Sequence, residues 1–156
     1  MEHSFPQVGS SAPDFALPDQ SGTLHSLQDA KGKWLLVYFY PKDDTPGCTK
    51  EACSFRDSFS TYKKKGITIL GVSPDSEKSH QKFVTKYKLP FTLLADTDHS
   101  IADAYGVYGE KKFMGRTYMG IHRTTFLIDE KGKIKKVFEK VKPEDHANEV
   151  LGAFAE

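Results

Sequence analysis

Continuous apolar runs alternate along the chain with segments whose apolar residues recur at helical spacing. The strongest run covers residues 34–40 and is stopped by Pro41, which predicts a central strand buried on both faces. Further runs predict strands at residues 67–72, 91–95, 124–128 and 133–138. The last two flank a four-residue connection typical of a hairpin, so we expect them to be antiparallel neighbours.

Helical stripes fall between these strands. Phe55, Phe59 and Tyr62 share one face of a helix that would begin at Thr45 and end at Gly66. Three more helices are predicted: one capped by Asp75 or Ser76, one across residues 96–105, and one from Pro143 to the end of the chain.

Two segments are less regular than the rest. Residues 11–29 form an extended, turn-rich lead-in that we expect to cover an edge of the core, and residues 107–120 form a Gly-rich loop of low regularity, to which we assign no structure. The order of elements predicts an α/β fold, a central mixed β-sheet flanked by helices on both faces. No internal repeat or linker divides residues 1–156, so we expect a single domain.

Charge and hydropathy exclude several classes of partner. The chain has 22 basic and 21 acidic residues, and this net charge of +1 creates no field that would attract nucleic acid or an anionic membrane. Neither a secretory signal nor an apolar run of membrane-spanning length is visible, so we expect a cytoplasmic protein. In that compartment two cysteines are more often reactive, metal-binding or inert than joined in a structural disulfide.

Cys48 occupies a position that favours a reactive thiol. With Thr45 as a capping residue and Pro46 as the first helical residue, Cys48 is the third residue of the helix. Free backbone N–H groups and the positive end of the helix dipole favour an anion there, and the thiolate is the form that attacks. The alternative is an inert core cysteine, since free cysteines are among the most buried residues.

Cys53 follows five residues later, a spacing that an intact helix makes too long for a disulfide. The two Cα atoms would be roughly 8.7 Å apart in a regular helix, whereas a disulfide requires about 4.4–6.8 Å. The pair would therefore bond only if the first helical turns unwind, which suits a transient catalytic disulfide. The C-x-x-C pattern of a dithiol reductase is absent, and no second cysteine pair or matching histidine pair completes a metal site.

The residues around Cys48 match a known signature. Pro41, Thr45 and Cys48 fill the pattern P-x-x-x-T-x-x-C of the peroxiredoxins, which the segment resembles. Together with Cys53 and residues 109–129, the chain is similar to the subfamily of bacterioferritin comigratory proteins, also called PrxQ. The resemblance extends over nearly the whole chain.

This resemblance implies a thioredoxin-like fold and assigns roles to individual residues. Cys48 would be the peroxidatic cysteine, Thr45 would hydrogen-bond the thiolate and the peroxide, and Pro41 would shield the pocket from water. Arg123 would hold the thiolate and polarise the peroxide oxygens, although from the residues alone it is a surface side chain before a strand. Cys53 matches the resolving cysteine of those members that have one at this spacing.

Glu51 matches a position that is often acidic in the family. An exposed helix carboxylate explains it equally well, so we leave it outside the core set of site residues.

The resemblance also implies a reaction cycle. The Cys48 thiolate would attack hydrogen peroxide or an organic hydroperoxide and become a sulfenic acid, which would condense with Cys53 to a disulfide. Thioredoxin or a similar dithiol would restore both thiols, with no haem, flavin or metal, and we expect a monomer because the resolving thiol is in the same chain. The rival functions are a protein disulfide oxidoreductase and a non-catalytic redox sensor, and measured peroxide consumption distinguishes them.

Overall fold

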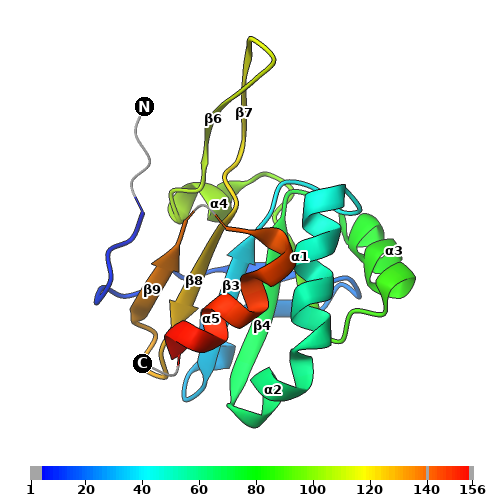
Figure 1. Cartoon of the computed structure of the whole chain (residues 1–156). Helices are drawn as coiled ribbons and strands as arrows, with labels where there is room; N and C mark the ends of the chain where they lie inside the picture. Colours follow the sequence, from blue (N-terminus) through cyan, green and yellow to red (C-terminus); the bar gives the residue numbers. More distant parts are fainter. Residues whose placement is uncertain (1–4, 140, 155–156) are drawn as a thin grey trace.

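The continuous apolar runs form the sheet at the centre of the protein. In the computed structural model, which describes residues 5–139 and 141–154, five strands are arranged in the order β5-β4-β3-β8-β9 (Figure 1). Their bounds are β3 (Trp34–Phe39), β4 (Ile67–Ser73), β5 (Thr92–Ala95), β8 (Thr124–Ile128) and β9 (Ile134–Phe138). β3, β4 and β5 are parallel, whereas β8 is antiparallel to both β3 and β9. The predicted strands and the hairpin of the last two are confirmed.

Strand β3 is buried on both faces because its side chains alternate between two apolar cores. Leu36 and Tyr38 belong to one core cluster, and Leu35, Val37 and Phe39 belong to the other. This central position explains why the run has no polar face.

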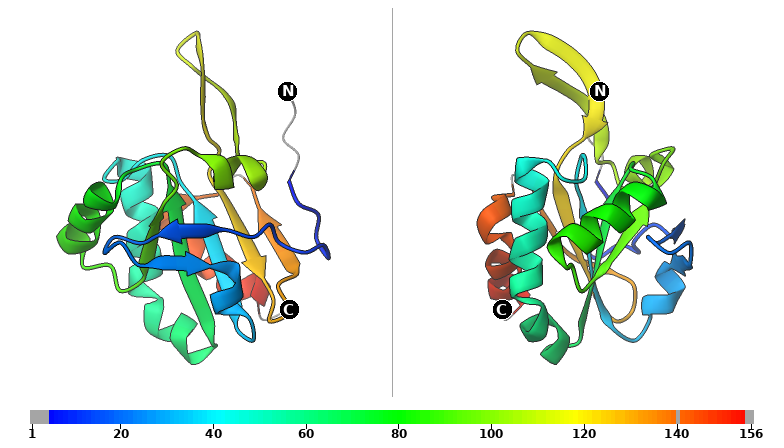
Figure 2. Two further views of the ribbon diagram at one scale, coloured as in Figure 1. Left: turned by 180° about the vertical axis from the view of Figure 1, so that it is seen from behind. Right: turned by 90° about the vertical axis from the view of Figure 1, so that its right-hand side faces the viewer.

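Helices cover both faces of the sheet, as expected for the predicted fold class. One face packs against α1 (Pro46–Asp57), α2 (Phe59–Lys64) and α5 (His146–Phe154), with η2 (Pro143–Asp145) before α5 and α3 (Glu77–Tyr87) along the β5 side (Figure 2). The other face is covered by β1 (Ala16–Pro18), β2 (Leu24–Ser26), η1 (Leu27–Ala30) and α4 (Ser100–Ala104). Among the described residues, no helix has the length and apolar character needed to cross a lipid bilayer.

The lead-in covers an edge of the core as predicted. β1 and β2 pair as an antiparallel hairpin, and a bridge between Asp19 and Leu94 joins this hairpin to β5. Phe15 and Leu17 insert into the core cluster on that face.

The prediction of one continuous helix between Thr45 and Gly66 is wrong. The helix is interrupted at Ser58, whose backbone (φ −103°, ψ 5°) leaves the helical region and separates α1 from α2. The apolar stripe survives the break, because Phe55 and Tyr62 both remain fully buried and their rings pack edge to face.

Residues 107–120 are regular, contrary to the loop of low regularity that the sequence suggested. They contain a two-stranded hairpin of β6 (Tyr108–Phe113) and β7 (Arg116–Ile121) that projects from the body of the protein (Figure 1). Met114 and Gly115 both have positive φ (50° and 78°), as a tight hairpin turn between twisted strands requires. The apolar-polar alternation of a half-buried strand is missing because most of the hairpin has no core to face.

Candidate active site

The strand-to-helix connection after β3 positions Cys48. β3 ends at Phe39, and α1 begins at Pro46 after a loop in which Asp44 has a positive φ of 57°. Pro46 is the first helical residue, so Cys48 is the third, as the sequence predicted. The site therefore lies at the carboxyl edge of a parallel pair of strands, the edge at which α/β sheets usually bind ligands.

Thr45 is at the N-cap position, but its hydroxyl does not cap the helix, which corrects the expected capping role. Thr45 Oγ1 instead donates to the carbonyl of Lys42 at 2.9 Å, across the turn that precedes α1. Among the described residues it makes no hydrogen bond to Cys48. Pro41 is half-buried at the start of the same loop.

Arg123 brings a positive charge to the sulfur of Cys48. It lies between β7 and β8, and its Nη2 donates to Cys48 Sγ at 3.3 Å. Cys48 is only 1% exposed, and the Arg123 side chain is 19% exposed, so the pair is largely removed from water. Arg123 is therefore not the surface side chain that the residues alone suggested.

Glu51 is the second partner of Arg123, and it is fully buried rather than exposed. Arg123 Nη1 donates to Glu51 Oε1 at 2.5 Å, so one guanidinium joins the thiol and the carboxylate. Burial raises the pKa of Glu51 to about 7, although the charge and hydrogen bond of Arg123 act to lower it. Burial acts to lower the pKa of Arg123, but the negative charges of Glu51 and Cys48 outweigh it and raise that pKa.

Sequence reasoning left Glu51 outside the site, yet a signal for it exists. Glu51 is three residues after Cys48, a spacing that places both side chains on one face of α1. A Cys48 that faces the protein therefore brings Glu51 to the buried face of α1 as well.

Tyr38 also lies near the thiol and was not identified from the sequence. Its hydroxyl is buried and has no hydrogen-bond partner among the described residues. Burial, followed by the negative charges of Glu51 and Cys48, raises the pKa of Tyr38 well above its usual value, so the phenol keeps its proton.

Cys53 is in the same helix as Cys48 but is not bonded to it. Both cysteines are free, and Cys53 is half-buried. Both lie within α1, so the helical separation of roughly 8.7 Å between Cα atoms applies. The reduced protein therefore holds the two thiols apart.

The site combines a buried thiol at a helix start with an arginine that donates a hydrogen bond to it, at one edge of a thioredoxin-like sheet. This arrangement is typical of the class of thiol-dependent peroxidases. Comparison with known proteins agrees, because residues 8–137 match the model of the AhpC/TSA family. The chain belongs to this family, and within it to the peroxiredoxins of the Bcp or PrxQ type.

Relatives support this placement over nearly the full chain. The chain is 56% identical to the putative peroxiredoxin Bcp of Coxiella burnetii, over 94% of this chain and 97% of that protein. It is 50% identical to peroxiredoxin Bcp of Escherichia coli, over 93% of each. The solved structure of a Xylella fastidiosa PrxQ mutant matches with a TM-score of 0.90 at 36% identity, covering 98% of this chain and 99% of that one. The resemblance seen in the sequence is confirmed, and the protein is a thiol peroxidase.

Proposed function

We propose that Cys48 is the peroxidatic cysteine of this enzyme. The observation that carries the proposal is the hydrogen bond from Arg123 to Cys48 Sγ, 3.3 Å long, at the start of α1. A guanidinium donor and the helix dipole both stabilise a thiolate, which is the nucleophilic form. In the first step the thiolate attacks one peroxide oxygen of ROOH, an S–O bond forms, the O–O bond breaks, and RO⁻ leaves and takes a proton.

Arg123 also stabilises the negative charge that develops on the leaving oxygen. Its Nη2 already lies 3.3 Å from Cys48 Sγ, and donors that are already in place lower the barrier because they need no reorganisation. We assign Thr45 to hydrogen bonding with the thiolate and peroxide, and Pro41 to shielding the pocket. For Thr45 this requires the hydroxyl to leave the carbonyl of Lys42 when peroxide binds.

Cys53 resolves the sulfenic acid in the second step. Its thiol attacks the sulfur of Cys48, a disulfide forms, and the hydroxyl of the sulfenic acid leaves as water. Because both cysteines belong to α1, the first turns of that helix must open for this bond to form.

A dithiol then returns the enzyme to its starting state, and we propose thioredoxin for this role. Thioredoxin is oxidised to its own disulfide as Cys48 and Cys53 regain their protons. A cycle that starts from two free thiols requires a reducing compartment, so we place the enzyme in the cytoplasm. The resolving thiol is in the same chain, which supports a monomer.

Hydrogen peroxide and organic hydroperoxides are the proposed substrates. A solved relative, the bacterioferritin comigratory protein of Xanthomonas campestris, is 40% identical and is described as having alkyl peroxide reduction activity. That description supports alkyl hydroperoxides as substrates of this chain as well.

Peroxide consumption in the presence of thioredoxin and its reductase tests the cycle. We expect Cys48→Ser to abolish turnover, whereas Cys53→Ser should be oxidised once and then be recycled poorly. Equal turnover in the wild type and Cys48→Ser would reject the proposal. Undiminished recycling of Cys53→Ser would show that another thiol resolves.

Substitution of Arg123 tests the carrying observation directly. Arg123→Lys keeps a charge but loses the fork that joins Cys48 and Glu51, and we expect the rate constant of Cys48 oxidation to fall by about 100-fold. Arg116→Lys, in the exposed hairpin, is the matched control and should react at the wild-type rate. An unchanged rate in Arg123→Lys would remove the arginine from the mechanism.

A further inference from the structure

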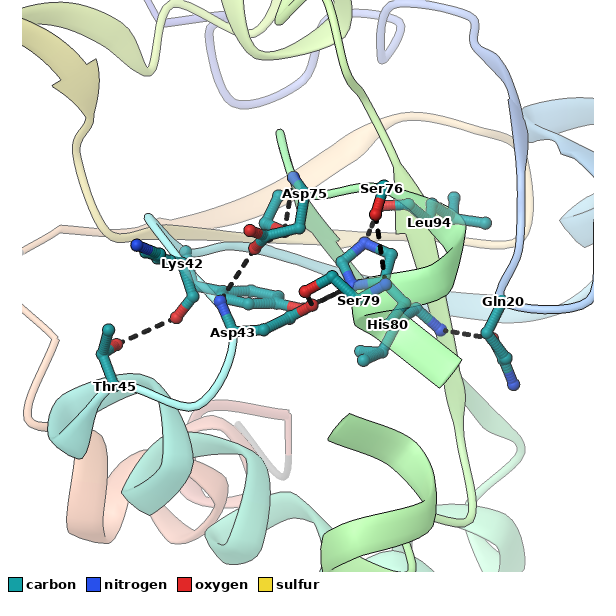
Figure 3. Close-up of polar contacts among 12 residues, drawn as sticks. Gln20, Lys42, Asp43, Thr45, Asp75, Ser76, Ser79, His80 and Leu94 are labelled. Carbon is teal, nitrogen blue, oxygen red and sulfur yellow. Dashed lines mark hydrogen bonds and ion pairs between the residues drawn. The ribbon is translucent and has the colours of Figure 1, made fainter. Parts of the chain in front are cut away.

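A buried polar group holds the loop that precedes Cys48. Asp43 is only 7% exposed, and its carboxyl group points toward Ser79 and His80 of α3 (Figure 3). Its Oδ1 accepts a hydrogen bond from the Tyr40 hydroxyl at 2.6 Å. Its Oδ2 accepts from Ser79 Oγ at 2.8 Å and lies 2.7 Å from Nδ1 of His80.

The backbone of Asp43 is fixed as well. Asp43 N donates to Asp75 Oδ2 at 2.8 Å, and the same oxygen accepts from Ser73 Oγ, at the end of β4, at 2.7 Å. We call Asp43, Asp75, Ser79 and His80 the Asp43 clamp. The clamp joins the loop to β4 and α3, and not to the helix that carries the two cysteines.

Hydrogen bonds engage both ring nitrogens of His80. Nε2 lies 2.9 Å from the carbonyl of Leu94, which only accepts, so Nε2 carries a proton. Nδ1 faces Asp43, whose carboxyl group also accepts from Tyr40 and Ser79. The fully buried His80 is therefore fixed on one side to Asp43 and on the other to β5.

Tyr40 donates a further hydrogen bond to Asp43. Burial, then Tyr38 and Asp43, raise its pKa well above the usual value, so its hydroxyl remains a donor to Asp43. The other ionisable group of the clamp is Asp75, which accepts hydrogen bonds from Asp43 N and from Ser73.

Metal binding is the competing use of the same residues. Asp43, Asp75 and His80 offer one ligand atom each within 4.8 Å of one another. However, both ring nitrogens of His80 face acceptors, and an ion would have to displace the proton between His80 and Asp43. The hydrogen bonds explain the arrangement of these three side chains without an ion.

We propose that His80 is a positioning residue for the peroxidatic site, acting through Asp43. Four residues, 44–47, separate Asp43 from Cys48, so the clamp sets where the thiol lies relative to Arg123. It also keeps the loop in place when α1 opens for the disulfide, so that the site re-forms after each cycle. This inference rests on the proposed role of Cys48.

The test compares His80→Gln and Asp43→Asn with Asp44→Asn. Asp44 undergoes the same chemical change one residue later, but its carboxylate bonds to the exposed Lys86 and to Tyr87 at the protein surface. We expect each clamp variant to lower the second-order rate constant of Cys48 oxidation by hydrogen peroxide by about 10- to 100-fold, because small displacements of reacting groups cost this much. Asp44→Asn should stay within about twofold of the wild type, as exposed ion pairs contribute little.

A double variant separates positioning from general loss of structure. If His80 acts through Asp43, the double variant His80→Gln/Asp43→Asn should react no more slowly than the slower single variant. Losses that multiply, or single variants that react at the wild-type rate, would overturn the proposal. Thermal unfolding checks that each variant is folded when its rate is measured.

If the variants do not fold, an NMR spectrum of the wild type tests the hydrogen bonds of His80. A long-range ¹H–¹⁵N correlation should show a proton on Nε2, the ring nitrogen that faces the carbonyl of Leu94. A ring without a proton on Nε2 would overturn the hydrogen bonds assigned to the clamp. The spectrum does not depend on peroxidase activity. An inactive Cys48 would therefore reject the proposed function without changing the result for His80.

Discussion

Arg123 connects the thiol of Cys48 to a buried carboxylate. Its guanidinium donates hydrogen bonds to both the Cys48 sulfur and Glu51. Removing a charged carboxylate from water is costly unless it is paired. Glu51 therefore holds the guanidinium in place. Because burial raises the pKa of Glu51 to about 7, this carboxyl group changes its charge near neutral pH.

Substitution of Glu51 by Gln should reveal this cost in the pH dependence of stability. Burial raises the pKa of Glu51 from 4.5 to about 7, so the folded protein binds the proton more tightly than the unfolded chain. The protonated Glu51 carboxyl group contributes fully to the free energy of unfolding below pH 4.5, and this contribution is lost as the pH rises through 7. We expect the wild type to lose about 3 kcal/mol relative to Glu51→Gln across this range.

Urea denaturation at a series of pH values measures the difference between the two proteins. Glu144→Gln, at an exposed position, is the control and should follow the wild type at every pH. A difference between the wild type and Glu51→Gln that stays constant with pH would contradict the account of Glu51.

The positions of Cys48 and Arg123 illustrate what single residues disclose in a sequence. Thr45, Pro46 and Cys48 are neighbours in the chain, so local rules for helix starts were enough to predict the place of the thiol. Arg123 lies 75 residues from Cys48, and only the family resemblance indicated that they meet. The spacing of Glu51 from Cys48 was a local signal that was not used, whereas the contacts of Tyr38 and Asp43 depend on tertiary packing that no local pattern specifies.

Helix α1 has two tasks that oppose each other. As a helix it presents Cys48 to Arg123, but as a helix it also keeps Cys48 and Cys53 too far apart to bond. The proposed cycle therefore requires the start of α1 to open, and in the proposed clamp the preceding loop stays attached to α3 and β4.

Amide hydrogen exchange should show where the opening stops. In the disulfide form we expect the amide of Thr49, which donates to the carbonyl of Thr45 at 2.8 Å, to exchange faster than in the dithiol form. The amide of Asp43, bonded to Asp75, should stay protected in both forms. Peroxide-treated Cys53→Ser, which cannot form the disulfide, is the control. A disulfide formed with full protection at Thr49 and no loss of helix would contradict this mechanism.

Helices and strands were predicted well where burial in the core leaves a pattern of apolar residues in the sequence, and poorly where it does not. The sheet strands have long apolar runs, and each was found in the structure. The break at Ser58 escaped prediction because the stripe of Phe55, Phe59 and Tyr62 continues on both sides of it. The hairpin of β6 and β7 escaped because its strands are mostly exposed and carry no two-residue period of burial.

The described part of the chain combines a covered sheet with a projecting hairpin (Figure 1). Both faces of the sheet are covered, whereas the β6–β7 hairpin leaves apolar side chains in solvent, namely Phe113, Met114, Tyr118 and Met119. Exposed apolar groups of this kind can mark an interface. The proposed cycle, however, needs no second chain, and a single domain remains a prediction.

Sedimentation of the dithiol and disulfide forms tests the assembly. We expect the mass of one chain, 17.5 kDa, in both redox states, because Cys48 and Cys53 react within one α1 helix. A stable dimer would contradict this expectation. In that event a Phe113→Ser variant, altered at a side chain that is 65% exposed, would show whether the hairpin forms the interface.

Mass spectrometry of the Cys53→Ser variant is the most direct test that Cys48 receives oxygen from the substrate. The variant is treated with one equivalent of hydrogen peroxide in the presence of dimedone, which traps sulfenic acids. We predict a dimedone adduct on Cys48 and none in a Cys48→Ser/Cys53→Ser variant treated in the same way. Peroxide consumption with Cys48 unmodified would contradict the mechanism.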